Sequence, residues 1–119
     1  MEETESNGES SVDWDNLTFS FTETDRMYIA TCKQGEEWEP GIMQDFQDLK
    51  LSPAAGVINY GQGLFEGMKA RRSEDGRVLL FRPELNARRA QDGCKRLGMP
   101  VVPEEMFLDA VHLVVQENM

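Results

Sequence analysis

The chain has 119 residues, of which 39% are hydrophobic and 29% charged. This length supports one small domain with a modest core, a radius of gyration of about 13–14 Å and no large enclosed cleft. The formal net charge of −10 argues against general binding to nucleic acid or anionic lipid, and no run of about 18 apolar residues is available to cross a membrane. Residues 1–50 hold 13 acidic and 3 basic side chains and residues 51–119 nine of each, so the acidity says little about a site in the second part.

Residues 1–12 are predicted to form a disordered acidic tail, because they hold too little apolar surface to offset the entropy of ordering. The segment has neither the apolar stretch of a secretory signal nor the arginines of a transit peptide, which favours a cytoplasmic location. Cys32 and Cys94 have no neighbouring cysteine in the sequence, which predicts two separate thiols in a reducing compartment.

Extended segments are expected next along the chain. Residues 27–32 have the β-branched and aromatic content of a strand, and a turn with a Pro-Gly pair follows at 36–41. A second strand is expected near 49–51, before a loop of small residues at 52–56.

A β-hairpin is predicted where Asp75 and Gly76 separate two partly apolar segments, 65–72 and 77–81. Glycine adopts the positive φ that such tight turns need, so an Asp-Gly pair between apolar segments is a strong hairpin signal.

The last third of the chain is predicted to be helical. Pro83 suits the first position of a helix over 83–97, and Gly98 suits its end. The apolar residues expected on one face of this helix are Leu85, Ala90, Cys94 and Leu97.

A second helix is predicted from Pro103, with Glu104 and Glu105 placed near the positive end of the helix dipole. Asn118 is the residue that could cap its C-terminal end. Its expected apolar residues are Met106, Phe107, Ala110, Val111, Val114 and Val115. The order of elements predicts an α+β fold in which helices pack on an antiparallel sheet.

The usual catalytic constellations are missing from the pattern. His112 is the only histidine and has no second ligand one turn away, so we expect a structural or surface histidine and no metal site. Glu104 and Glu105 are sequence neighbours whose side chains point apart, and no serine or cysteine has an evident base, so no catalytic residue is assigned.

Three glycines at 61, 63 and 67 have a spacing close to that of phosphate-binding loops, but the strand–loop–helix context of a dinucleotide fingerprint is missing. Either the glycines serve backbone turns, or they make room for Tyr60 and Phe65 to form the wall of a pocket.

Basic residues gather on and around the first predicted helix, at Arg82, Arg88, Arg89, Lys95 and Arg96. They could form a solvated helix face. Alternatively, Arg89 lies close enough to the apolar face to point inward, where its planar set of donors would suit a phosphate group.

Several ordered motifs resemble the N-terminal part of branched-chain amino acid aminotransferases, in the version found in plants. They are residues 51–70 (LSPAAGVINYGQGLFEGMKA), 80–89 (LFRPELNARR) and 96–100 (RLGMP), and the likeness extends over about residues 13–117. The family consists of class IV, fold-type IV enzymes that depend on pyridoxal 5′-phosphate. The resemblance therefore implies that residues 13–119 form the small N-terminal α+β domain of such an enzyme.

Position by position, the resemblance implies a substrate pocket and a cofactor anchor. Phe19, Tyr60 and Phe65 correspond to aromatic residues that line the pocket for the substrate side chain. Arg89 corresponds to the arginine that binds the cofactor phosphate. The implied partners are branched-chain amino acids and 2-oxo acids, with 2-oxoglutarate as amino-group acceptor, and a homodimer is a further expectation.

The family's cofactor-binding lysine belongs to a larger C-terminal domain, and none of Lys33, Lys50, Lys69 and Lys95 stands in its context. We therefore expect the 119 residues to be truncated before that domain, inactive alone and unable to hold pyridoxal phosphate stably. The alternative is a non-catalytic interaction module, or a truncated remnant, that pairs with itself or with a full-length relative.

Overall fold

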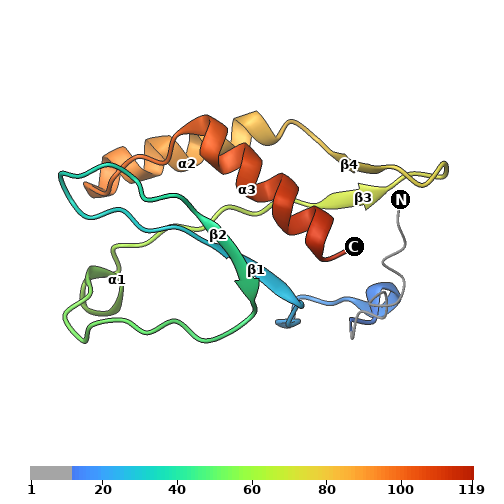
Figure 1. Ribbon diagram of the computed structural model, residues 1–119, viewed down its shortest axis with the longest axis horizontal. Coiled ribbons are helices and arrows are strands. Elements are labelled where there is room, and N and C mark those ends of the chain that lie inside the picture. Colours follow the sequence, from blue (N-terminus) through green and yellow to red (C-terminus); the bar gives the residue numbers. More distant parts are fainter. Residues whose placement is uncertain (1–11) are drawn as a thin grey trace.

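A computed structural model describes residues 12–119, so the tail expected at 1–12 lies outside the described residues except for Val12, which is buried. The elements are η2 (Trp14–Asn16), β1 (Arg26–Ile29), β2 (Ile42–Asp45), α1 (Gly56–Asn59), β3 (Ala70–Arg72), β4 (Val78–Leu80), α2 (Pro83–Leu97) and α3 (Glu104–Glu117) (Figure 1). This confirms the α+β class. The strands form two separate two-stranded antiparallel sheets, β1-β2 and β3-β4, and not one continuous sheet.

The first sheet confirms one predicted strand and corrects the other. β1 (Arg26–Ile29) overlaps the expected strand at 27–32 and ends three residues before the expected end, but its partner β2 covers Ile42–Asp45 and not residues 49–51. The register pairs Arg26 with Asp45, and the Arg26 Nη1 atom donates to the Asp45 carboxylate at 2.7 Å. The apolar side chains at Leu49 and Leu51 are about half exposed, at 57% and 51%. The position of β2 is therefore set by its pairing with β1. The β-propensity of its own residues does not predict this position.

The second sheet is the predicted hairpin. Ala70 pairs with Leu80 and Arg72 with Val78, and Gly76 adopts φ +86° in the turn between the strands. The Ser73 amide donates to the Arg77 carbonyl at 2.8 Å and closes the turn. Both strands are three residues long, so the hairpin is shorter than the apolar segments that predicted it.

Helix α2 has the predicted ends, since Pro83 occupies its first turn and Gly98 ends it with φ +70°. Its buried residues are Ala87, Ala90 and Cys94, which recur at the helical spacing of three and four positions. The expected core residues Leu85 and Leu97 are instead 46% and 38% exposed. The buried face of α2 is thus made of small side chains, which lets neighbouring chain segments approach the helix closely.

Helix α3 packs against α2 and β1 (Figure 1). Its six expected apolar residues are half-buried. Its C-terminal end is closed by Asn118, as the sequence predicted: the Asn118 side-chain amide donates to the Val114 carbonyl at 2.8 Å and to the Arg26 carbonyl at 3.1 Å. The Asn118 Oδ1 atom accepts the amide hydrogens of Asp25 at 3.0 Å and of Arg26 at 2.9 Å. One side chain therefore caps α3 and fixes it to the start of β1.

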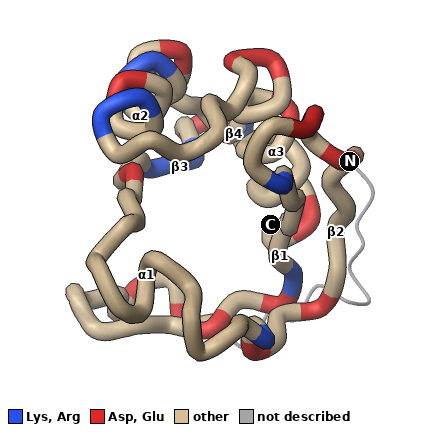
Figure 2. The backbone as a smooth tube through the Cα atoms, turned by 90° about the vertical axis from the view of Figure 1, so that its left-hand side faces the viewer, with Lys and Arg blue, Asp and Glu red and all other residues tan. Residues whose placement is uncertain are grey.

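The molecule is more extended than a compact chain of its length, with a radius of gyration of 15.9 Å where 13–14 Å was expected. Figures 1 and 2 show the turn of α1 held away from α2 and α3. Among residues 12–119, the buried apolar side chains are limited to Val12, Ala87, Ala90 and Cys94. Much of the apolar surface is consequently exposed.

Candidate functional site

The strongest cluster of charged contacts joins α2 to the loop that precedes the hairpin. Arg89 donates from Nε to Glu66 Oε1 and from Nη2 to Glu66 Oε2, the second bond at 2.7 Å. Asn86 donates to Glu66 Oε2 at 2.8 Å and to the Gly67 carbonyl at 3.1 Å. Asn86 and Arg89 are three positions apart, so they lie on the same side of the helix and reach Glu66 together.

The two partners of the ion pair differ in exposure. The Glu66 side chain is 9% exposed and the Arg89 side chain 71%. The hydrogen bond from Arg89 lowers the pKa of Glu66 to about 2, against the opposing effect of burial, and the bond from Asn86 adds to the lowering. Glu66 in turn raises the pKa of Arg89. Both groups are therefore charged near neutral pH.

The expectation that Arg89 points inward is wrong for the described chain. The buried residues of α2 include Ala87 and Ala90, and Arg89 lies about 100° around the helix from Ala90 and about 200° from Ala87, away from that face. Its guanidinium has five N–H groups, of which Glu66 engages two. The remaining groups belong to an exposed edge, and this donor set fits a phosphate group.

The three predicted pocket residues are all exposed. Phe19 is 109% exposed, Tyr60 86% and Phe65 92%. Phe65 directly precedes Glu66, so the chain brings this aromatic residue next to the Arg89 cluster. Phe19 precedes β1 and Tyr60 directly follows α1, and neither side chain lines the groove between β4 and α3 or the groove beside Trp38.

Backbone geometry explains two of the three glycines in the pattern, Gly61 and Gly63. Gly61 has φ +64°, a conformation that favours glycine. A Cβ atom at Gly63 would lie 2.9 Å from the Val57 side chain, so that position needs close approach. Gly67 has open space around it.

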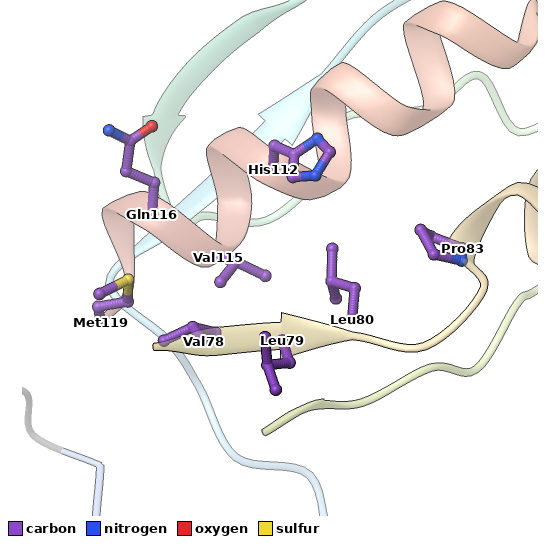
Figure 3. A pocket seen from close by; sticks show the side chains of 8 residues that line it. All are labelled: Val78, Leu79, Leu80, Pro83, His112, Val115, Gln116 and Met119. Carbon is purple, nitrogen blue, oxygen red and sulfur yellow. The ribbon is translucent and has the colours of Figure 1, made fainter. Parts of the chain in front are cut away.

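An apolar groove of about 400 Å³ lies between β4 and α3 and was not predicted. Figure 3 shows Leu80 and Val115 reaching into the space between strand and helix, whereas Leu79 points away. His112 and Gln116 line the groove from α3, and Met119 lines it from beyond the end of that helix. A second groove of about 360 Å³ lies between Tyr28, Trp38 and the start of α3. Neither groove could be predicted from local sequence patterns, because each is formed by segments far apart along the chain.

Other charged groups form ordinary surface contacts. Figure 2 shows basic residues along α2, and among them Arg88 pairs with Glu104 of α3 at 3.2 Å.

Within residues 12–119, no three His, Cys, Asp or Glu side chains are grouped to hold a metal ion. The helices of that part of the chain are too short or too polar to cross a membrane. Cys32 and Cys94 are both free, as predicted.

No family model matches the chain, but curated proteins do. Branched-chain amino acid aminotransferase 2, chloroplastic, of Humulus lupulus is 54% identical over 107 residues, which cover 90% of this chain. Methionine aminotransferase BCAT4 of Arabidopsis thaliana is 48% identical over 92% of the chain. A branched-chain-amino-acid aminotransferase of Helicobacter pylori is 49% identical over 90% of it.

The chain spans about a quarter to a third of the length of these relatives, with coverage of 26%, 31% and 31%. The likeness extends over nearly all of the 119 residues, in both plant and bacterial proteins. By its sequence, the chain is similar to one segment of the branched-chain amino acid aminotransferases, in plants and in a bacterium alike.

Proposed function

We propose that this chain supplies one part of the active site of a pyridoxal-phosphate-dependent aminotransferase that acts on branched-chain amino acids. Arg89 binds the phosphate of the cofactor, and Phe19, Tyr60 and Phe65 contact the side chain of the substrate. The observation that carries the proposal is the 54% identity to a branched-chain aminotransferase over 90% of the chain. The exposed donor edge of Arg89 is the structural support for the phosphate site.

Pyridoxal phosphate, when bound, supplies the electron sink for transfer of an amino group. The residues of this chain hold the cofactor by its phosphate and select the substrate by its side chain. Arg89 offers N–H donors that match phosphate oxygens, and its charge is fixed at all physiological pH values. The three aromatic side chains favour aliphatic substrates, because burial of each CH₂ group contributes about 0.8 kcal/mol. They also offer few partners to a hydroxyl or charged side chain, which disfavours polar amino acids.

The substrate range is part of the same proposal. One relative with 48% identity is a methionine aminotransferase. Methionine has a flexible apolar side chain similar in size to that of leucine, so an aromatic pocket can take both. We propose leucine, isoleucine and valine as the main substrates, with 2-oxoglutarate as the acceptor.

We propose in addition that the 119 residues do not catalyse this reaction on their own. None of the four lysines at 33, 50, 69 and 95 stands in the sequence context of the family's cofactor lysine. The purified 119-residue chain is expected to form no glutamate from leucine and 2-oxoglutarate. Glutamate formation by that chain would contradict this part of the proposal.

Replacement of Arg89 by alanine tests the phosphate site in the intact protein that carries these residues. The expected result is a loss of pyridoxal phosphate affinity of about tenfold or more, because charge-assisted hydrogen bonds to the phosphate disappear. The matched control is Arg88→Ala, which removes a neighbouring arginine of α2 that pairs with Glu104 at 3.2 Å. Equal affinities for the Arg89→Ala and Arg88→Ala variants would contradict the assignment.

A second candidate function is an interaction module that pairs with itself or with a full-length relative. It is favoured by the exposed apolar side chains, which include Phe19 at 109%, Phe65 at 92% and Phe81 at 82%. Such surfaces commonly mark contacts with other proteins. This function requires no cofactor, so its association is expected to be the same with and without pyridoxal phosphate.

A further inference from the structure

Glu66 has no role in the functional proposal, although it makes the closest contacts of the Arg89 guanidinium. We propose that Glu66 is a positioning residue, which holds the Arg89 guanidinium in one plane so that its free edge is presented to the cofactor phosphate. The inference rests on the proposed function of Arg89. It concerns a residue that binds neither cofactor nor substrate itself.

The contact geometry supports a fixed guanidinium. Two different nitrogens of Arg89, Nε and Nη2, donate to the two different oxygens of Glu66. A two-point contact of this kind fixes the guanidinium plane as well as its position. A single contact, such as that of Arg88 with Glu104, leaves rotation about the bond free. Glu66 uses one edge of Arg89 only, so the Nη1 donors and one Nη2 donor stay available.

The carboxylate is itself held from a second side. Glu66 Oε2 accepts from Asn86 at 2.8 Å as well as from Arg89 at 2.7 Å, and Asn86 also donates to the neighbouring Gly67 carbonyl. The loop that carries Glu66 is thereby fixed to α2 at two positions, three residues apart on the helix. With only 9% of the Glu66 side chain exposed, solvent has little access to compete for these bonds.

The negative charge of Glu66 could either compete with the phosphate for Arg89 or hold Arg89 in place for it. The structure favours the second effect. A carboxylate that competed with the phosphate would have to leave Arg89 when the phosphate binds. Glu66 instead keeps a second donor in Asn86, little exposure and contact with one edge alone, which leaves the other edge open. It therefore acts together with the phosphate, which uses the adjacent edge of the guanidinium formed by Nη1 and Nη2.

The test is a double-mutant cycle in the intact protein, using Glu66→Gln, Arg89→Ala and the combined variant. Dissociation constants are measured for pyridoxal phosphate and for pyridoxal, which lacks the phosphate. Glu66→Gln is expected to weaken binding of pyridoxal phosphate about tenfold and to leave pyridoxal binding unchanged, because the effect acts through the phosphate anchor. In the Arg89→Ala background the same substitution is expected to have no further effect.

The ratio of the two dissociation constants keeps the test valid if a variant is partly unfolded, because both are measured on the same folded fraction. Glu104→Gln, at the single-contact pair with Arg88, is the matched control and is expected to leave the ratio unchanged. Glu66→Asp keeps the charge on a shorter side chain. Its ratio of dissociation constants is expected to lie between those of Glu66→Gln and the unaltered protein.

Three results would overturn the inference. Tighter binding of pyridoxal phosphate by Glu66→Gln would make Glu66 a competitor of the phosphate. An unchanged ratio for Glu66→Gln, with a large loss for Arg89→Ala, would remove the positioning role and leave the phosphate site in place. An unchanged ratio for Arg89→Ala, or no binding by the unaltered protein, would overturn the proposed function and this inference with it.

Discussion

Glu66 gives the described chain a pH dependence in the acid range. Its pKa in the folded state is lowered to about 2 from an ordinary value of 4.5. A carboxyl with a lowered pKa stabilises the folded state fully above its unfolded value, and this contribution is lost as the pH falls through the folded value. The contribution of the Glu66 charge is therefore complete above about pH 5 and is lost between about pH 4.5 and pH 2.

The prediction is that the free energy of unfolding differs between the unaltered chain and Glu66→Gln by a constant amount above about pH 5. The difference is expected to shrink as the pH falls from about 4.5 to 2, and urea unfolding at a series of pH values measures it. Glu104→Gln serves as the comparison, because its exposed pair with Arg88 is expected to contribute little. A difference for Glu66→Gln that stays constant down to pH 2 would contradict the assigned pKa.

At the scale of single residues, family resemblance identified Arg89, and of the two orientations that the sequence left open the inward one is wrong, because the Arg89 side chain is exposed. The helical period was applied to an expected face that included two leucines, whereas the buried face consists of Ala87, Ala90 and Cys94. Glu66 was missed because its contact with Arg89 spans 23 positions and depends on the path of the intervening loop and hairpin. The only sequence signal for Glu66 was its place in the motif at residues 51–70, and that place alone does not show which residue it contacts.

At the scale of elements, local signals predicted the hairpin and both long helices. Each has its own end signal, such as the Gly76 turn and the Gly98 cap, and these signals need no tertiary context. β2 and α1 were not predicted, since each has four residues and weak local preference. Pairing with β1 defines β2, so its position is a tertiary property.

The element-scale prediction concerns Asn118, which caps α3 through one hydrogen bond to Val114 and joins the helix to the start of β1 through three more. Asn118→Ala is expected to lower the free energy of unfolding by about 1–2 kcal/mol, because it removes a helix cap and leaves the amides of Asp25 and Arg26 without this partner. Denaturant unfolding measures the change.

Gln116→Ala is the matched control for Asn118→Ala. Gln116 lies on the last turn of the same helix and is exposed. Its replacement is expected to change stability by less than about 0.5 kcal/mol. Equal effects of the two substitutions would mean that the link between α3 and β1 does not contribute to stability.

At the scale of the whole molecule, the chain exposes 9515 Å², whereas a compact protein of 13.5 kDa exposes about 6500 Å². Residues 1–11 cannot account for the difference, because even a fully extended segment of that length exposes only about 1700 Å². The remainder belongs to the described residues and includes large apolar side chains at more than half exposure. The fold of these residues therefore presents surface suited to contact with further protein.

The prediction that follows is that the purified 119-residue chain binds an apolar fluorescent dye and associates as its concentration is raised, because burial of apolar surface against a second copy is favourable. Sedimentation velocity over a range of concentrations measures the association, and dye fluorescence measures the exposed apolar surface. A compact single-domain protein of similar mass, which lacks large exposed apolar patches, is the control and is expected to bind little dye. Monomeric sedimentation at every concentration, together with dye binding no greater than that of the control, would contradict this use of the exposed surface and with it the second candidate function.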